Sequence, residues 1–156
     1  MTESTEVSPQ ALLDAARVFE ERIPFNRVLG LRIERVGDSD VVVRFDMRDE
    51  LVGNFTRGNL HGGVISSVLD VVGGLGGFIA LLKREGVQSL KDEADKFSRL
   101  GTIDLRVDYL RPGLGETFSA KGFVLRAGRK VAVTRMELHN EEDSLIAVGT
   151  GAYSIS

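Results

Sequence analysis

The stretch NFTRGNLHGGVISSVLDVVGGLGGFIALL, residues 54–82, contains the longest apolar segment of this 156-residue chain. Its larger apolar side chains recur at steps of three and four residues, which is helical spacing. They are Val64, Val68, Val71, Leu75, Phe78, Ile79 and Leu82. The residues between them are mostly Ser, Gly, Ala and Val, so no face is made for water, and we expect a helix buried in protein. A membrane span is not favoured, because the uninterrupted run from Val71 to Leu82 is far shorter than the roughly 20 residues that a bilayer requires.

Four glycines, Gly73, Gly74, Gly76 and Gly77, lie inside this helix. Each costs roughly 1 kcal/mol relative to Ala in a helix interior. Close packing against the helix backbone could offset that cost, and a sheet curling round the helix would provide such packing.

The composition predicts a single globular domain. Hydrophobic residues make up 42% and charged residues 28% of the chain. We expect a disordered polar tail over residues 1–7 and one domain over residues 8–156. The net charge of −3, without a basic block, gives no reason to expect a nucleic-acid partner.

The Cys and His content of the chain excludes or disfavours several kinds of site. The absence of Cys excludes disulfides, thiol nucleophiles and thiolate metal sites, and two well-separated His residues do not favour a metal site, so we expect no metal. The first residues have neither the basic nor the apolar region of a signal peptide, so we expect a cytoplasmic protein without a membrane partner.

The remaining elements follow from periodicity and turn residues. Ser8-Pro9 predicts the start of an amphipathic helix that Pro24 ends. The charged segment 83–99 predicts the end of the buried helix and an exposed excursion with a short helix over Leu90, Ala94 and Phe97. Alternating apolar and polar residues predict strands over 31–36, 41–47, 102–110, 116–126, 130–139 and 144–155. The last four follow one another with tight turns, which predicts an antiparallel meander.

This order predicts an α+β protein with the hotdog fold: an antiparallel sheet of about six strands wrapped round one long central helix, with an additional N-terminal helix. The segment Gly58-Asn59-Leu60-His61-Gly62-Gly63, followed by Asp70 nine positions after the His, resembles the signature of the PaaI-type hotdog acyl-CoA thioesterases. The segment TIDLRVDYLRP, residues 102–112, is similar to the next strand of that family.

The resemblance covers roughly residues 25–155 in element order. It implies an enzyme that hydrolyses acyl-CoA thioesters without a cofactor. It also implies a homodimer or homotetramer whose site lies between subunits, with Asp70 of one chain facing Thr102 of the other. A long open strand edge agrees with pairing of subunits.

The signature places two kinds of chemistry on one helix. Gly62 and Gly63 allow close approach to the free N–H groups of a helix start, where a thioester oxygen could be stabilised, with the Gly63 amide as the main donor. Asp70 lies about two turns further along. A carboxylate on a buried helix needs a reason, and acting as a base or as a nucleophile is one. The sequence leaves both roles open, beside a structural alternative in which a neighbouring Ser or the backbone holds Asp70.

The resemblance implies further catalytic residues. His61 is expected mainly to shape the helix start, with a general base as the alternative. Asn54 lies seven residues before the His, whereas the family has its Asn six before; one extra loop residue would let Asn54 hold the thioester oxygen or water. Thr102 matches a Ser or Thr that contacts the water, although a β-branched residue also suits a strand.

Substrate binding is expected at the helix start and at two strand ends. The implied residues are Gly62, Arg111, Pro112, Gly128, Arg129 and Lys130. Arg and Lys at strand ends suit the phosphates of CoA, and they equally suit exposed hairpins. The alternative function is a non-catalytic hotdog protein that binds acyl-CoA as a sensor or subunit. Asp70 argues against it, because a pure binder needs no buried carboxylate.

Overall fold

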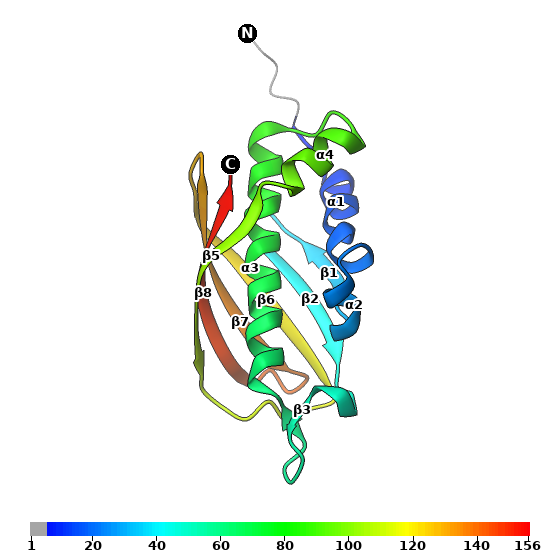
Figure 1. The fold of residues 1–156 in the computed structure, drawn as a ribbon, viewed down its shortest axis with the longest axis vertical. Helices are drawn as coiled ribbons and strands as arrows, with labels where there is room; N and C mark the ends of the chain where they lie inside the picture. Colours follow the sequence, from blue (N-terminus) through cyan, green and yellow to red (C-terminus); the bar gives the residue numbers. More distant parts are fainter. Residues whose placement is uncertain (1–5) are drawn as a thin grey trace.

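The computed structural model describes residues 6–156, so residues 1–5 of the expected tail lie outside the described part (Figure 1). The first helix, α1 (Pro9–Glu21), begins where the sequence predicts. The Ser8 hydroxyl accepts a hydrogen bond from the Ala11 N–H at 3.2 Å, which satisfies one of the free donors of the first turn. The buried residues of α1 form its apolar face: Leu12, Ala15, Ala16 and Phe19.

The centre of the fold is α3 (Gly62–Glu85), a single helix of 24 residues that lies against one face of the sheet (Figure 1). This helix is long and apolar enough to cross a membrane, but 67% of its most apolar window is buried inside the fold. The prediction of a core helix is therefore confirmed.

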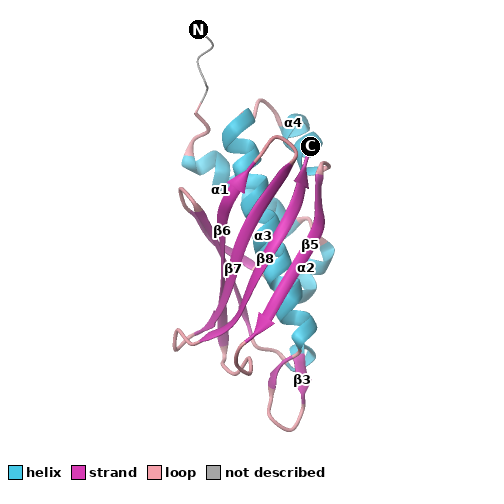
Figure 2. Cartoon of the chain, turned by 90° about the vertical axis from the view of Figure 1, so that its left-hand side faces the viewer, coloured by secondary structure: helices cyan, strands magenta, loops and turns pink. Residues whose placement is uncertain are grey.

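The sheet contains six strands in the order β1-β2-β6-β7-β8-β5, and all neighbours are antiparallel. The strands are β1 (Arg32–Val36), β2 (Asp40–Asp46), β5 (Leu100–Tyr109), β6 (Thr117–Ala127), β7 (Val131–Asn140) and β8 (Leu145–Ile155). Figure 2 shows the strands on one side and α3 behind them. The predicted α+β hotdog fold is confirmed.

The predicted four-strand meander is wrong for β5. This strand pairs with β8 at the edge of the sheet, and β6 pairs with β2. The chain must therefore cross from one side of α3 to the other between β5 and β6. As a result, the β1–β2 hairpin joins the same sheet as β6, β7, β8 and β5, and this sheet curves round the helix. Short-range sequence patterns do not encode this connection.

The glycines of α3 allow the predicted close approach. A side-chain carbon added at Gly73 would come within 3.0 Å of atoms of Tyr153, Thr134 and Met136 on the facing strands. On the sheet side, a carbon added at Gly122 would come equally close to the main chain of α3. The cost of glycine in the helix is therefore offset by contact between helix and sheet backbones.

Four short elements lie outside the sequence prediction. Pro24 was expected to end the N-terminal helix, but it begins another, α2 (Pro24–Leu29), because proline is well suited to the first helical position. The predicted loop 48–60 contains a 3₁₀ turn (Asp49–Leu51) and a hairpin of β3 (Val52–Asn54) and β4 (Asn59–Leu60), which projects beyond the start of α3 (Figures 1 and 2).

The expected short helix in the charged segment is α4 (Leu90–Phe97). Phe97 packs edge-on against Phe19 of α1 and Phe78 of α3, with ring centroids 5.5 and 5.6 Å apart. This aromatic cluster closes α4 over the second half of α3.

Candidate active site

The start of α3 is shaped by His61. This residue is the N-cap, and its Nδ1 accepts a hydrogen bond from the Gly63 N–H at 2.8 Å. The geometry agrees with the structural role expected of His61. It also occupies the amide predicted as the main oxyanion donor, so a substrate oxygen at Gly63 has to share or displace the imidazole.

Asp70 is half-buried on α3, next to the edge strand β5 of the sheet. The Thr102 hydroxyl lies 3.0 and 3.3 Å from its two carboxylate oxygens and donates to them. This contact forms within one chain, which corrects the prediction that Asp70 faces Thr102 of a second chain. The physical reason is a bulge in β5 between Thr102 and Asp104, which turns Thr102 toward α3 and leaves Ile103 59% exposed.

The serines near Asp70 do not hold its carboxylate. The hydroxyls of Ser66 and Ser67 donate instead to the Gly63 carbonyl, at 3.1 and 2.7 Å. The alternative in which a neighbouring serine pairs with Asp70 is therefore not realised. Gly63 is held at both of its main-chain groups by side chains of its own helix start.

A second contact to residue 70 was missed by the sequence analysis. The Tyr153 hydroxyl donates to the main-chain oxygen of Asp70 at 3.2 Å. Burial, and then the charge of Asp70, raise the pKa of Tyr153 far above its ordinary value. The phenol therefore stays protonated. Alternation in β8 predicts that Tyr153 is buried, but not which helix residue it reaches.

A surface cavity of about 370 Å³ opens at the start of α3, and it gathers several of the expected residues: Asn54, Gly62, Arg111 and Pro112 line it. Tyr109, expected only as a strand residue, also lines it, and its hydroxyl donates to the Gly62 carbonyl at 3.1 Å.

Two of these polar side chains already have partners. Asn54 accepts hydrogen bonds from the main-chain N–H and the hydroxyl of Thr56, at 3.0 and 2.6 Å, which fix the tip of the hairpin. The Arg111 guanidinium donates to the Leu145 carbonyl at 2.9 Å. Both residues lie beside the helix start, as expected, and these bonds occupy the amide oxygen of Asn54 and one guanidinium nitrogen of Arg111.

The other expected substrate-binding residues, Gly128, Arg129 and Lys130, lie at the opposite end of α3. They form the turn between β6 and β7, where Arg84, near the end of the helix, donates to the Gly128 carbonyl. A helix of 24 residues is roughly 36 Å long. One chain therefore does not bring this turn together with Arg111 and Pro112.

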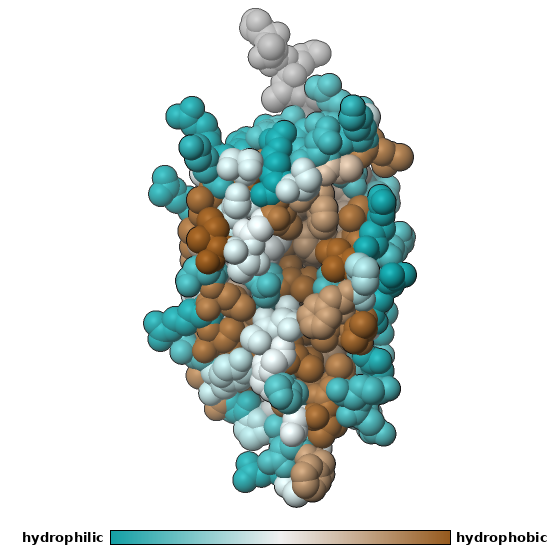
Figure 3. All heavy atoms as spheres, in the orientation of Figure 1, coloured by the Kyte–Doolittle hydropathy of each residue, from teal (hydrophilic) through white to brown (hydrophobic). Residues whose placement is uncertain are grey.

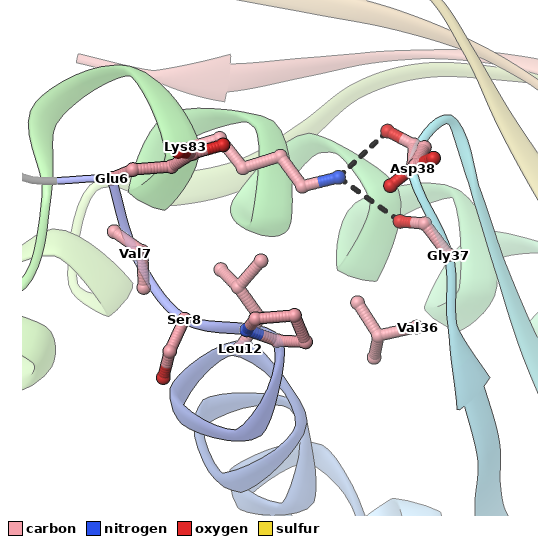
Figure 4. A pocket seen from close by; sticks show the side chains of 9 residues that line it. Glu6, Val7, Ser8, Leu12, Val36, Gly37, Asp38 and Lys83 are labelled. Carbon is pink, nitrogen blue, oxygen red and sulfur yellow. Dashed lines mark hydrogen bonds between the residues drawn. The ribbon is translucent and has the colours of Figure 1, made fainter.

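A cavity of about 540 Å³ lies between the start of α1, the β1–β2 turn and α3 (Figure 4). Lys83 crosses it and donates to the carbonyls of Gly37 and Asp38 at 3.0 and 2.6 Å. The lysine thus ties the turn to α3, and none of the expected site residues lines this cavity. Within residues 6–156, no three His, Asp or Glu side chains are grouped closely enough to hold a metal ion.

A six-stranded sheet round one helix, with a carboxylate about two turns into that helix, defines a hotdog-fold thioester hydrolase. The sequence matches the family model described as "Thioesterase superfamily" over residues 57–147, a range that includes the helix start, Asp70 and Thr102. The chain belongs to the thioesterase superfamily.

Relatives along nearly the whole chain agree. The chain is 47% identical over 146 residues to the medium/long-chain acyl-CoA thioesterase YigI of Escherichia coli K12, covering 94% of each protein. The protein of that name from Salmonella typhimurium gives the same identity and coverage. A crystal structure of a Shewanella oneidensis protein related to the thioesterase superfamily is 46% identical, with a TM-score of 0.87, over 95% of this chain and 97% of that one.

Proposed function

We propose that this chain is an acyl-CoA thioesterase of the PaaI type that acts on medium-length and long acyl chains, with Asp70 as its catalytic carboxylate. The observation that carries the proposal is the Asp70–Thr102 contact between α3 and the edge strand β5. It holds a carboxylate in one orientation where a substrate can reach it, in a chain similar along 94% of its length to a medium/long-chain acyl-CoA thioesterase.

Asp70 can act in two ways. As a base, it takes a proton from water while the water oxygen bonds to the thioester carbon; the C–S bond then breaks, and the thiol and the free acid leave. As a nucleophile, its oxygen bonds to that carbon and the thiolate leaves; water then hydrolyses the resulting anhydride. Single turnover in ¹⁸O-water separates them, because only the nucleophilic route can carry the label into the Asp70 carboxylate.

The same helix cannot supply both the carboxylate and the amide donors to one thioester. Asp70 lies eight residues after Gly62, roughly 12 Å along the axis. A water-mediated attack and an oxyanion contact together bridge only about 6 Å. We infer that the helix start of a second copy completes each site, so that the functional unit is a homodimer.

The edge strand β5 supports this assembly. It ends the sheet and carries the exposed Ile103, and an open edge is a template for pairing. Antiparallel pairing of two β5 strands would bring the end of one α3 to the same side as the start of the other. The turn of Arg129 and Lys130 from one subunit could then contribute phosphate contacts beside Arg111 of its partner copy.

The surface over α3 suits an apolar substrate. Figure 3 shows hydrophobic residues over much of the middle of this face and hydrophilic residues at its rims. An acyl chain or a second subunit can cover such a surface, and both belong to the proposal.

The proposal is tested by hydrolysis of a panel of acyl-CoAs from short to long chains, read as kcat/KM, with the oligomeric state measured on the same sample. We expect medium and long chains to be preferred and the Asp70→Asn variant to bind acyl-CoA without hydrolysing it. If the wild-type chain binds but hydrolyses no member of the panel, the alternative of a non-catalytic acyl-CoA-binding protein stands. The cytoplasmic location remains a prediction from the sequence.

A further inference from the structure

A buried polar contact lies behind Asp70, on the side of α3 that faces the sheet. Tyr153 is only 1% exposed, and its hydroxyl donates to the main-chain oxygen of Asp70. The hydroxyl reaches the helix because Gly73 has no side chain: a carbon there would come within 3.0 Å of the Tyr153 oxygen, the Thr134 hydroxyl and the Met136 sulfur. Gly73 therefore leaves the space that the phenol group occupies.

Tyr153 and Thr102 hold the same residue from neighbouring strands. They are direct partners in the pairing of β8 with β5, and opposite residues of an antiparallel pair share one face of the sheet. Thr102 contacts the carboxylate, whereas Tyr153 contacts the main chain. Asp70 is thus held at its carboxylate and at its main-chain oxygen.

Tyr153 does not meet the substrate, because it is buried beneath the helix. It does not hold the helix together either, since an α-helical carbonyl already accepts the N–H four residues further along. The hydroxyl adds a second donor to one carbonyl only. The Tyr153 hydroxyl therefore affects the position of residue 70. That position matters because the Asp70 carboxylate has to be oriented toward a water molecule or a thioester carbon.

We propose that Tyr153 is a positioning residue of the active site: its hydroxyl, admitted by Gly73, anchors the main chain of Asp70 so that the carboxylate keeps the orientation that Thr102 gives it. This inference rests on the catalytic role proposed for Asp70. It matters for rate because a displacement of about 1 Å in an active site can cost on the order of 100-fold.

The first test is Tyr153→Phe, which removes a single oxygen. We expect kcat to fall about tenfold with KM changed less than about twofold. The reason is that the orientation of the Asp70 carboxylate is lost, whereas substrate binding is not affected. In the Asp70→Asn background the same change should leave the residual rate unaltered, since no carboxylate remains to be aimed. An equal fold loss in both backgrounds overturns the inference.

The second test compares two glycines of the same helix. Gly73→Ala should reproduce the loss of kcat and lower Tm by several degrees, because the new carbon displaces the Tyr153 hydroxyl. Gly76→Ala is the matched control: the nearest atom to its new carbon is 3.5 Å away, an ordinary contact, so kcat should not change. In the double variant Gly73→Ala/Tyr153→Phe, the loss of Tm should be smaller than the sum of the single losses. Equal loss of kcat in both Ala variants would overturn the inference.

A structural measurement separates failure of the inference from failure of the proposed function. If the wild type hydrolyses no acyl-CoA, the function fails, and the ¹³C signal of the Asp70 carboxyl carbon then decides the positioning role. We expect this signal to move in Tyr153→Phe and to stay in place in Gly76→Ala. A signal unchanged by Tyr153→Phe contradicts the positioning role whatever the activity.

Discussion

The two halves of α3 are built from the same kinds of small and apolar residues, yet they are treated differently by the fold. From Val72 to Ile79 every residue is buried beneath the sheet and the aromatic cluster of Phe19, Phe78 and Phe97. From Gly63 to Val71, one face stays partly open, and Asp70 lies on that face. We therefore expect reactivity in the partly open half of α3 and expect stability to depend most on the other half.

The sharpest test of this contrast is Asp70→Asn, in the open half. We expect kcat to fall by about 10³-fold, because an amide can neither accept a proton from water nor attack a thioester. The free energy of unfolding should change by less than about 1 kcal/mol, since the residue is half-buried and the exchange is isosteric. Steady-state kinetics and urea unfolding of one preparation measure both. A loss of activity below about tenfold would contradict the assignment.

The opposite result is expected for Leu75→Ala, in the closed half. Leu75 is fully buried, so the cavity left behind should lower the free energy of unfolding by about 3 kcal/mol. The activity per folded molecule should stay within about threefold of the wild type. Urea unfolding, with activity normalised to the folded fraction, measures this. A stable but inactive variant would break the division between the halves.

A smaller effect is expected for Thr102→Val, which removes the hydroxyl that holds Asp70. We expect kcat to fall about tenfold, because the carboxylate loses its orienting donor. Thr150→Val, at an exposed position of β8, is the control and should keep full activity. If both variants behave alike, the Asp70–Thr102 contact has no part in the reaction.

The smallest effect concerns α4, remote from the site. Lys96 donates to Asp92 at 2.6 Å, and this hydrogen bond is the main cause that lowers the pKa of Asp92 below its ordinary value of 3.8. A lowered folded-state pKa means that the ionised carboxylate stabilises the folded state. This contribution is fully present above the ordinary pKa and is lost as the pH falls through the folded value. Asp92→Asn should therefore lower Tm slightly at neutral pH and not at all in strong acid, as a pH series of melting curves will show.

Sequence reasoning succeeded where a property repeats along the chain. The period of the apolar residues identified α3, and the alternation around Thr117–Ala127 and its neighbours identified the strands. The signature predicted that His61 shapes the helix start and that Asp70 lies about two turns into the helix, and both follow from spacing within one helix.

It failed where the outcome depends on non-local pairing or on a single extra residue. Alternation of residue types does not reveal the bulge in β5 that leaves Ile103 exposed and brings Thr102 to Asp70. No short pattern indicates that β5 pairs with β8, or that Tyr153 reaches the backbone of Asp70. The distance between Arg111 and the turn at Arg129 is likewise a property of the length of α3.

The unpaired edge of β5 has a practical consequence. In the homodimer proposed above, each site exists only while the two copies are associated, so specific activity should fall on dilution below the dissociation constant of the pair and return on concentration. Salt or temperature that loosens the edge would then switch off turnover in chains that are still individually folded. Every molecule would keep its Asp70 carboxylate, but dissociated chains would not turn over substrate.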